Sequence, residues 1–264
     1  MIGQFASHAS VTEAGDPSLP AALVLHGGGG PRTVAPLVAR LGATRHVFAP
    51  THPGWDCTER PADLTSVAQL ADDYLELLAA DDAQVRARGG VALVGSSIGG
   101  WIALEMAVRA AIDPRFEGLV DRVVVIDSVG VEVAGEPIAD FFSLSPRQLA
   151  KRAWHDAERG FVDPAGLSDA ERAVQAGNAR SLAAIAGSAM SDPTLLARLA
   201  AVTAPTLVAW GASDRIATPA YGRALAAAIP DARFAQIEGA GHLPHLEAPA
   251  ETYAVLEGFL SAGR

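Results

Sequence analysis

The stretch Val91–Trp101, VALVGSSIGGW, constrains the fold of this chain more than any other. Its first four residues, Val91–Val94, are typical of a buried strand, and the apolar positions at its far end begin a helical pattern. Gly95 and Gly99 lie between the two and remove side chains that would collide in a tight turn. Ser97 stands between these glycines, so we expect it to be strained and exposed where the strand ends. An ordinary glycine-rich connection is the alternative.

Composition sets the limits on the class of protein. The chain has 264 residues, 50% hydrophobic and 19% charged, which fits one α/β domain with an insertion or two small domains. Its net charge of -10 argues against a nucleic-acid surface. The single cysteine, Cys57, allows neither an internal disulfide nor a cysteine metal cluster. Neither a signal peptide nor a membrane span is indicated, so we expect a cytoplasmic protein with no membrane association.

Short apolar runs alternate with helical patterns along most of the chain. This alternation predicts an α/β fold with a mostly parallel sheet and helices on both faces. Residues 11–20 are polar and turn-rich, with a hairpin-like turn at 14–17. The predicted strands cover residues 21–25, 46–49, 91–94, 123–126, 206–210 and 233–237.

The alternation breaks between about residues 131 and 201. Helix-capping signals recur there, at Ser145-Pro146, at Ser168 with Glu171, and at Asp192-Pro193. No strand is predicted within this segment. We therefore expect a core formed by residues 1–130 and 202–264, with residues 131–201 inserted as a helical cap.

A run of four glycines, Gly27–Gly30, follows the strand predicted at 21–25 and precedes a helix. Without side chains, its backbone N–H groups can face a ligand. The lysine and the Ser/Thr of a phosphate-binding P-loop are missing, so no nucleotide is expected. His26, just before the run, is expected to hydrogen-bond locally and not to bind a metal ion.

Three side chains of complementary chemistry follow predicted strands. A serine hydroxyl needs a base to remove its proton, and a histidine, with an ordinary pKa of about 6.5, suits this task. The imidazole in turn needs a carboxylate to orient it. Ser97, Asp214 and His242 each lie just past a strand, and the carboxyl ends of parallel strands meet in one crevice. We predict that these three residues form a catalytic triad.

With these motifs, the chain resembles the α/β-hydrolase superfamily over nearly its whole length. The matching residues are His26–Gly30, the loop Gly-x-Asp-x-Thr-x-Arg-Pro from Gly54, the turn around Ser97, Gly211-x-x-Asp214, and Gly241-His242 with Glu247 and Pro249. The resemblance implies a Ser–His–Asp hydrolase with a helical lid. It also implies an oxyanion hole formed by the N–H groups of Ile98 and Gly28, with Gly29 as the alternative to Gly28. Asp56 departs from the pattern, because many relatives carry a glycine there, and it is expected to bond within its own loop.

Other candidates compete for these roles. Asp127 also ends a strand, and some relatives take their triad acid from that position, although Asp214 fits the usual acid loop better. His245 is interpreted as a surface or pocket-lining residue, and His52 and His155 as solvent-facing residues.

The predicted function is hydrolysis of a small to medium, fairly apolar ester through an acyl-enzyme on Ser97, without metal or cofactor. Hydrolysis of a C–C bond in a diketone-type ring-cleavage product is the main enzymatic alternative, and perhydrolase and acyltransferase activities stay open. A non-catalytic ligand receptor of the same fold is the other class. A small-molecule substrate is the expected partner, and the sequence predicts no oligomeric state.

Overall fold

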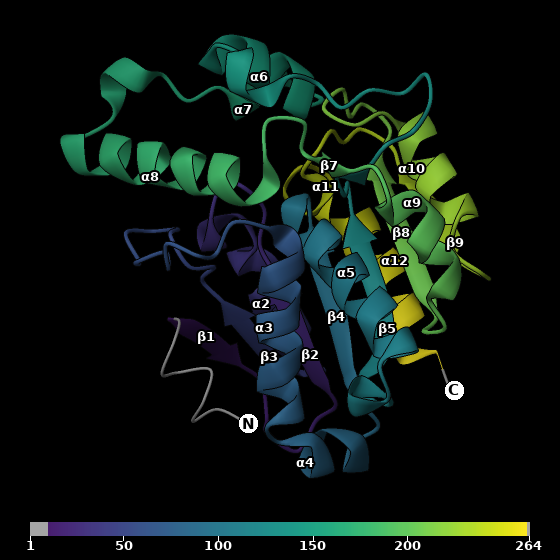
Figure 1. Cartoon of the computed structure of the whole chain (residues 1–264). Coiled ribbons are helices and arrows are strands. Elements are labelled where there is room, and N and C mark those ends of the chain that lie inside the picture. The colour runs from purple at the N-terminus through teal and green to yellow at the C-terminus, as the bar shows by residue number, and fades with distance from the viewer. Residues whose placement is uncertain (1–9, 263–264) are drawn as a thin grey trace.

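The computed structural model describes residues 10–262 of the chain. Within them, seven strands form one sheet in the order β1-β3-β2-β4-β5-β8-β9 (Figure 1). Every neighbouring pair is parallel except β1 and β3, which run antiparallel at one edge. The strands are β1 (Val11–Ala14), β2 (Ala21–Leu25), β3 (His46–Pro50), β4 (Val91–Ser96), β5 (Val120–Ile126), β8 (Thr206–Gly211) and β9 (Arg233–Ile237).

Helices cover both faces of the sheet, as the sequence predicts. The central strands are buried along their whole length, because apolar residues point alternately to the two faces. One face packs against α2 (Ala35–Leu41) and α12 (Pro249–Ser261). The other packs against α3 (Val67–Ala79), α5 (Ile98–Ile112) and α10 (Pro219–Ala227). Two cores therefore hold the sheet between helical layers.

The segment between β5 and β8 lies across one end of the sheet, where Figure 1 shows α6, α7 and α8 together. Ser145 and Ser168 form the predicted capping boxes at the starts of α6 and α8. The elements of this inserted segment are β6 (Gly130–Val131), α6 (Pro146–Ala153), α7 (Ala157–Gly160), α8 (Asp169–Ala186), β7 (Ser191–Asp192) and α9 (Leu195–Arg198).

The prediction that residues 131–201 contain no strand is wrong. β6 and β7 form a separate parallel pair, in which Gly130 lies opposite Ser191 and Val131 opposite Asp192. Strands of two residues are too short to show a sequence period, so their pairing depends on tertiary contacts. This small sheet ties the two ends of the inserted segment together.

The structure also contains elements that the sequence analysis did not identify. Val11–Ala14 is the edge strand β1, where only a polar, turn-rich region is expected. Its residues are exposed or half-buried, so they give no apolar run. The remaining helices are α4 (Asp82–Ala87) and α11 (Pro244–Glu247), with short 3₁₀ turns at Pro31–Thr33, Pro114–Phe116, Phe141–Ser143, Pro164–Gly166 and Leu199–Ala201.

A buried charge cluster fixes the inserted segment to α5. Glu105 is fully buried and accepts two hydrogen bonds from Arg198, at 2.9 and 2.7 Å, and a further one from Arg109. Arg198 also pairs with Asp192 of β7 at 2.7 Å. Burial opposes the charge of Glu105, but its bonds to Arg198 and Arg109 hold its pKa below the ordinary value. The helix that begins beside Ser97 is thereby joined to α9.

No helix in residues 10–262 is long and apolar enough to cross a membrane.

Candidate active site

Ser97 lies at the tight turn between β4 and α5, with φ 56° and ψ −121°. A Cβ atom added to Gly95 would lie 2.1 Å from the carbonyl oxygen of Gly99, and one added to Gly99 would lie 2.2 Å from that of Leu25. These contacts are with backbone atoms that cannot move aside, so glycine is required at both positions. The N–H of Ser97 donates to the carbonyl of Ile126 at 2.9 Å, which holds the strained residue against β5.

Ser97, His242 and Asp214 are in hydrogen-bond contact at the carboxyl end of the sheet. His242 Nε2 is 3.0 Å from Ser97 Oγ, and His242 Nδ1 is 2.8 Å from Asp214 Oδ2. Ser97 and His242 are each 8% exposed and Asp214 2% exposed. Because an ionised carboxylate only accepts hydrogen bonds, Nδ1 carries the imidazole proton and Nε2 is free to accept the serine proton. The arrangement can therefore activate the Ser97 hydroxyl.

The Asp214 carboxylate is fixed by its own loop. Its Oδ1 atom accepts hydrogen bonds from the N–H groups of Ile216, at 2.8 Å, and Ala217, at 3.3 Å. These two bonds fix the carboxylate and leave Oδ2 directed at His242.

The loop that carries His242 is bonded to the inserted segment. The N–H of His242 donates to the carbonyl of Ala153, at the end of α6, at 2.6 Å. The carboxylate of Glu247 accepts from Gly241 N–H and from His155 N–H, each at 2.7 Å. Glu247 belongs to the motif recognised in the sequence, but its bridge to the inserted segment needs contacts that only the fold provides.

The glycine run lies beside Ser97. A Cβ atom on Gly27 would be 3.1 Å from Ser97 Cβ, and one on Gly28 would be 2.9 Å from Leu182 Cδ2 of α8. Trp55 Nε1 donates to the carbonyl of Gly28 at 2.9 Å, which fixes the direction of this peptide. No acceptor in residues 10–262 takes a hydrogen bond from the N–H of Gly28 or of Ile98. Gly28 is half-buried, whereas Gly29 is exposed.

Two histidines whose rings are in contact, His26 and His52, support the glycine run. His26 Nδ1–H donates to the Gly27 carbonyl at 2.8 Å, so His26 forms the local hydrogen bond expected from the sequence. The N–H of His52 donates to His26 Nε2 at 3.0 Å, and His52 Nε2–H donates to the His26 carbonyl at 3.1 Å. Burial lowers the pKa of His26 to about 4, and burial together with His26 lowers the pKa of His52. Both rings are therefore neutral at pH 7.

The solvent-facing position expected for His52 is wrong, because its side chain is fully buried and its Nδ1 accepts from Tyr74 at 2.7 Å. His245 is buried as well, only 1% exposed, and its Nε2–H donates to the Thr33 carbonyl at 2.9 Å. His155 is exposed, as expected. Neither polarity nor position in the chain distinguishes these histidines, since their burial depends on which loops pack over them.

Asp56 does not bond within its own loop as expected. It has φ 49°, a left-handed conformation that glycine adopts freely, which explains why a glycine suits this position. Its N–H donates to Asn178 Oδ1 of α8 at 2.9 Å. Ser181, one turn further along α8, donates to the Gly54 carbonyl at 2.8 Å. The loop after β3 is thus joined to the inserted segment.

Asp127 lies beside Asp214 but does not contact His242 by a hydrogen bond. It is fully buried, and its Oδ1 atom accepts from Gly211 N–H at 2.9 Å. One oxygen from each of Asp127 and Asp214 and one nitrogen of His242 lie within 4.8 Å of one another. Burial and the neighbouring Asp214 raise the pKa of Asp127 well above its ordinary value. Carboxylate and imidazole groups can also bind a metal ion, but His242 and Asp214 already bond to each other.

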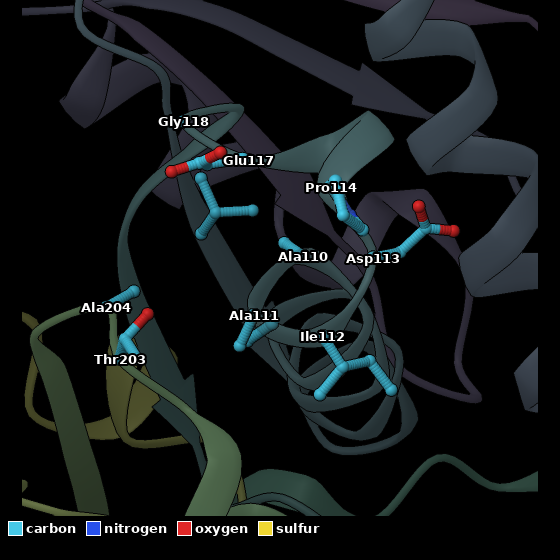
Figure 2. Close-up of a pocket in the computed structure, with 11 residues that line it drawn as sticks. Ala110, Ala111, Ile112, Asp113, Pro114, Glu117, Gly118, Thr203 and Ala204 are labelled. Atoms are coloured by element: carbon cyan, nitrogen blue, oxygen red, sulfur yellow. The ribbon is translucent and has the colours of Figure 1, made fainter.

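A surface pocket of about 320 Å³ lies far from these residues. Figure 2 shows it at the C-terminal end of α5, beside Ile112 and Asp113. Ser97 lies at the other end of this helix, roughly 20 Å away for a helix of that length. The pocket therefore does not contribute to the site at Ser97.

Comparisons with known proteins show which sequences and structures this chain resembles. The sequence model described as "Alpha/beta hydrolase family" matches residues 22–255. Lipase 1 of Psychrobacter immobilis is 28% identical, covering 92% of this chain and 78% of its own. A putative lipase structure from Acinetobacter baumannii has a TM-score of 0.76 at 21% identity, covering 95% of this chain and 86% of its own. The 2-hydroxy-6-oxo-6-phenylhexa-2,4-dienoate hydrolase of Rhodococcus sp. strain RHA1 has a TM-score of 0.71 at 22% identity, covering 96% and 95%.

Proposed function

This chain belongs to the alpha/beta hydrolase family, and we propose that it is a serine hydrolase that cleaves a small to medium, fairly apolar ester. The observation that carries the proposal is the continuous hydrogen-bond path from Ser97 Oγ through His242 to Asp214. A nucleophile, a base and a carboxylate that orients the base are the parts that acyl transfer to water requires.

In the proposed mechanism, Ser97 Oγ attacks the ester carbonyl carbon while His242 Nε2 takes the hydroxyl proton. The carbonyl oxygen becomes an oxyanion in the tetrahedral intermediate. The intermediate collapses to an acyl-enzyme, and the imidazolium of His242 gives its proton to the departing alcohol. Water then attacks the acyl carbon, with His242 again as base, and releases the acid and free Ser97. Asp214 stabilises the imidazolium in both steps.

We assign the oxyanion hole to the N–H groups of Ile98 and Gly28. Ile98 is the first residue of α5, so its N–H has no partner within the helix. The helix dipole also favours a negative charge at this end. The bond from Trp55 to the Gly28 carbonyl fixes the Gly28 peptide, and a preset donor needs no reorganisation as charge develops. Gly29, the alternative, is exposed to solvent, and donors act more weakly there than in a buried site.

An apolar substrate fits the residues nearest this site. Leu182 of α8 packs on Gly28, and Ile185 and Met190 of the inserted segment are buried in the same core cluster. We propose that the inserted segment acts as a cap, which would surround an acyl chain with aliphatic side chains. The likeness to Lipase 1 supports an ester as the substrate.

The test is hydrolysis of p-nitrophenyl acetate, butyrate and octanoate by wild type and by Ser97→Ala. We expect turnover with wild type and a loss of about 10⁶-fold in kcat with Ser97→Ala. Ser96→Ala is the matched control, because Ser96 is the neighbouring serine and lies outside the predicted triad. After treatment with a fluorophosphonate probe, mass spectrometry should locate the label on Ser97.

The other outcomes separate the alternatives. A labelled Ser97 without ester turnover would contradict the ester assignment and favour C–C bond cleavage, to be assayed with a diketone-type ring-cleavage product. Absence of both label and turnover would contradict a hydrolase and favour a ligand receptor.

A further inference from the structure

Asp127 is a buried carboxyl group that the proposed mechanism does not use. It follows β5 with φ 46°, a strained conformation for a residue other than glycine. Gly211 N–H donates to its Oδ1 atom at 2.9 Å. Within the described part of the chain, no donor reaches its Oδ2 atom, which is buried. A buried polar atom without a partner is costly, so its protonation state needs an explanation.

The ionisable groups that face Asp127 come from three neighbouring elements. Asp214 follows β8, His242 follows β9, and Glu247 lies in α11. Two of the three are carboxylates, and Asp127 forms no ion pair with a lysine or arginine among the described residues. Its surroundings therefore disfavour a negative charge.

One carboxyl oxygen of Asp127 and one of Asp214 lie within 4.8 Å of each other, and a hydrogen bond between the two side chains would join them. Two carboxyl groups form such a bond only when one of them carries a proton, and two buried carboxylates side by side repel each other. Asp214 accepts from Ile216 N–H, Ala217 N–H and His242 Nδ1–H, whereas Asp127 accepts from a single N–H. Donors stabilise the charged form, so the negative charge belongs on Asp214 and the proton on Asp127.

We propose that Asp127 is a neutral carboxylic acid in the active enzyme and donates its O–H to the carboxylate of Asp214. Asp127 is then a positioning residue, which holds the group that orients His242. This inference rests on the proposed serine hydrolase function. A neutral Asp127 also balances charge, because one carboxylate instead of two then faces the imidazolium that forms when Ser97 attacks. The raised pKa of Asp127 agrees with this state.

Two substitutions separate the roles of the proton and of the charge. Asp127→Asn keeps an acceptor for Gly211 N–H and supplies an amide N–H donor for Asp214, so kcat/KM should fall by less than about tenfold. Asp127→Leu removes the donor to a charged group, so kcat should fall by about 10- to 100-fold with KM little changed. Asp63→Asn, at an exposed aspartate before α3, is the control for substitution itself.

Two further measurements do not depend on turnover. Infrared spectra at pH 7 should contain the carbonyl band of a protonated carboxylic acid in wild type and Asp63→Asn, and lack it in Asp127→Asn. If Asp127 keeps its proton on folding, the folded state binds more protons than the unfolded state above pH about 4. The free energy of unfolding then falls as pH rises. The Tm of Asp127→Asn minus the Tm of wild type should therefore increase as pH rises from 4 to 8.

The results distinguish a neutral Asp127 from an ionised one. A 10⁴-fold loss in Asp127→Asn without a protonated-carboxyl band would overturn the inference and make Asp127 the ionised triad acid, since about that loss follows when a triad acid becomes an amide. A metal ion bound stoichiometrically in purified protein would also overturn it, with the cation in place of the proton. If wild type hydrolyses no ester, the proposed function fails, while the infrared and Tm measurements still test Asp127. If Asp127→Leu does not fold, those measurements and Asp127→Asn decide alone.

Discussion

Replacing Asp214 by asparagine should remove most of the activity, for a reason that the structure makes specific. Ile216 N–H and Ala217 N–H both need an acceptor, so the amide oxygen of the asparagine takes the place of Oδ1. Its NH₂ group then faces His242 Nδ1, now 2.8 Å from the carboxylate. Nδ1 must accept instead of donate, which moves the imidazole proton to Nε2 and prevents that atom from taking the proton of Ser97.

The expected loss in kcat/KM is about 10⁴-fold, or about 5 kcal/mol of transition-state stabilisation. Hydrolysis of p-nitrophenyl butyrate measures it, with Asp63→Asn as a matched surface control and circular dichroism to establish folding. KM should change little, because Asp214 is buried and its Oδ2 atom contacts His242. A loss below about tenfold would refute this reasoning and show that another carboxylate, with Asp127 the nearest, orients His242.

The other predictions concern the groups that hold the site together. Trp55→Phe leaves the Gly28 carbonyl without its donor and should lower kcat/KM by about tenfold in the same ester assay, with an unchanged value as the contradicting outcome. Glu105→Gln breaks a buried ion pair with Arg198 and should lower the free energy of unfolding by about 3–5 kcal/mol in urea titrations. A loss below about 1 kcal/mol would mean that this buried pair contributes no more than an exposed one. His26 is neutral when folded, with a pKa of about 4 against an ordinary value of 6.5, so its contribution to stability should be complete above pH 6.5 and fall by about 3 kcal/mol as pH falls to 4. Because burial also lowers the pKa of His52 and His245, His26→Gln is the comparison, and a Tm difference from wild type that stays constant over this range would contradict the burial of a neutral His26.

The positions of Ser97, Asp214 and His242 are predictable because each follows a predicted strand. The strands before Ser97 and Asp214, β4 and β8, are buried and apolar, whereas β9, before His242, is a partly exposed edge strand. His242 lies 145 residues from Ser97 and 28 from Asp214, yet the sheet places β4, β5, β8 and β9 side by side with their carboxyl ends together. Local patterns of apolar residues and glycines therefore contain the information that brings these side chains near one another.

Other parts of the site depend on packing between loops, which no local pattern records. His52 looks like a loop histidine in the sequence, but Tyr74 and His26 enclose it in the fold. The pairing of β6 with β7 involves residues about sixty positions apart and only two residues from each strand. The proton that we assign to Asp127 follows from which donors reach Asp214, and that also becomes visible only in three dimensions.

Hydrogen bonds join the inserted segment to the loop that carries His242, the proposed base. His242 donates its backbone N–H to Ala153, and Glu247 joins the residue before His242 to His155. Ser97 and His242 are also nearly closed off from solvent, which strengthens the hydrogen bonds between them. A change at the end of α6 should therefore shift the imidazole as well as the aliphatic side chains that we propose to surround the substrate. We therefore expect substitutions in this segment that change substrate selectivity to alter kcat together with KM.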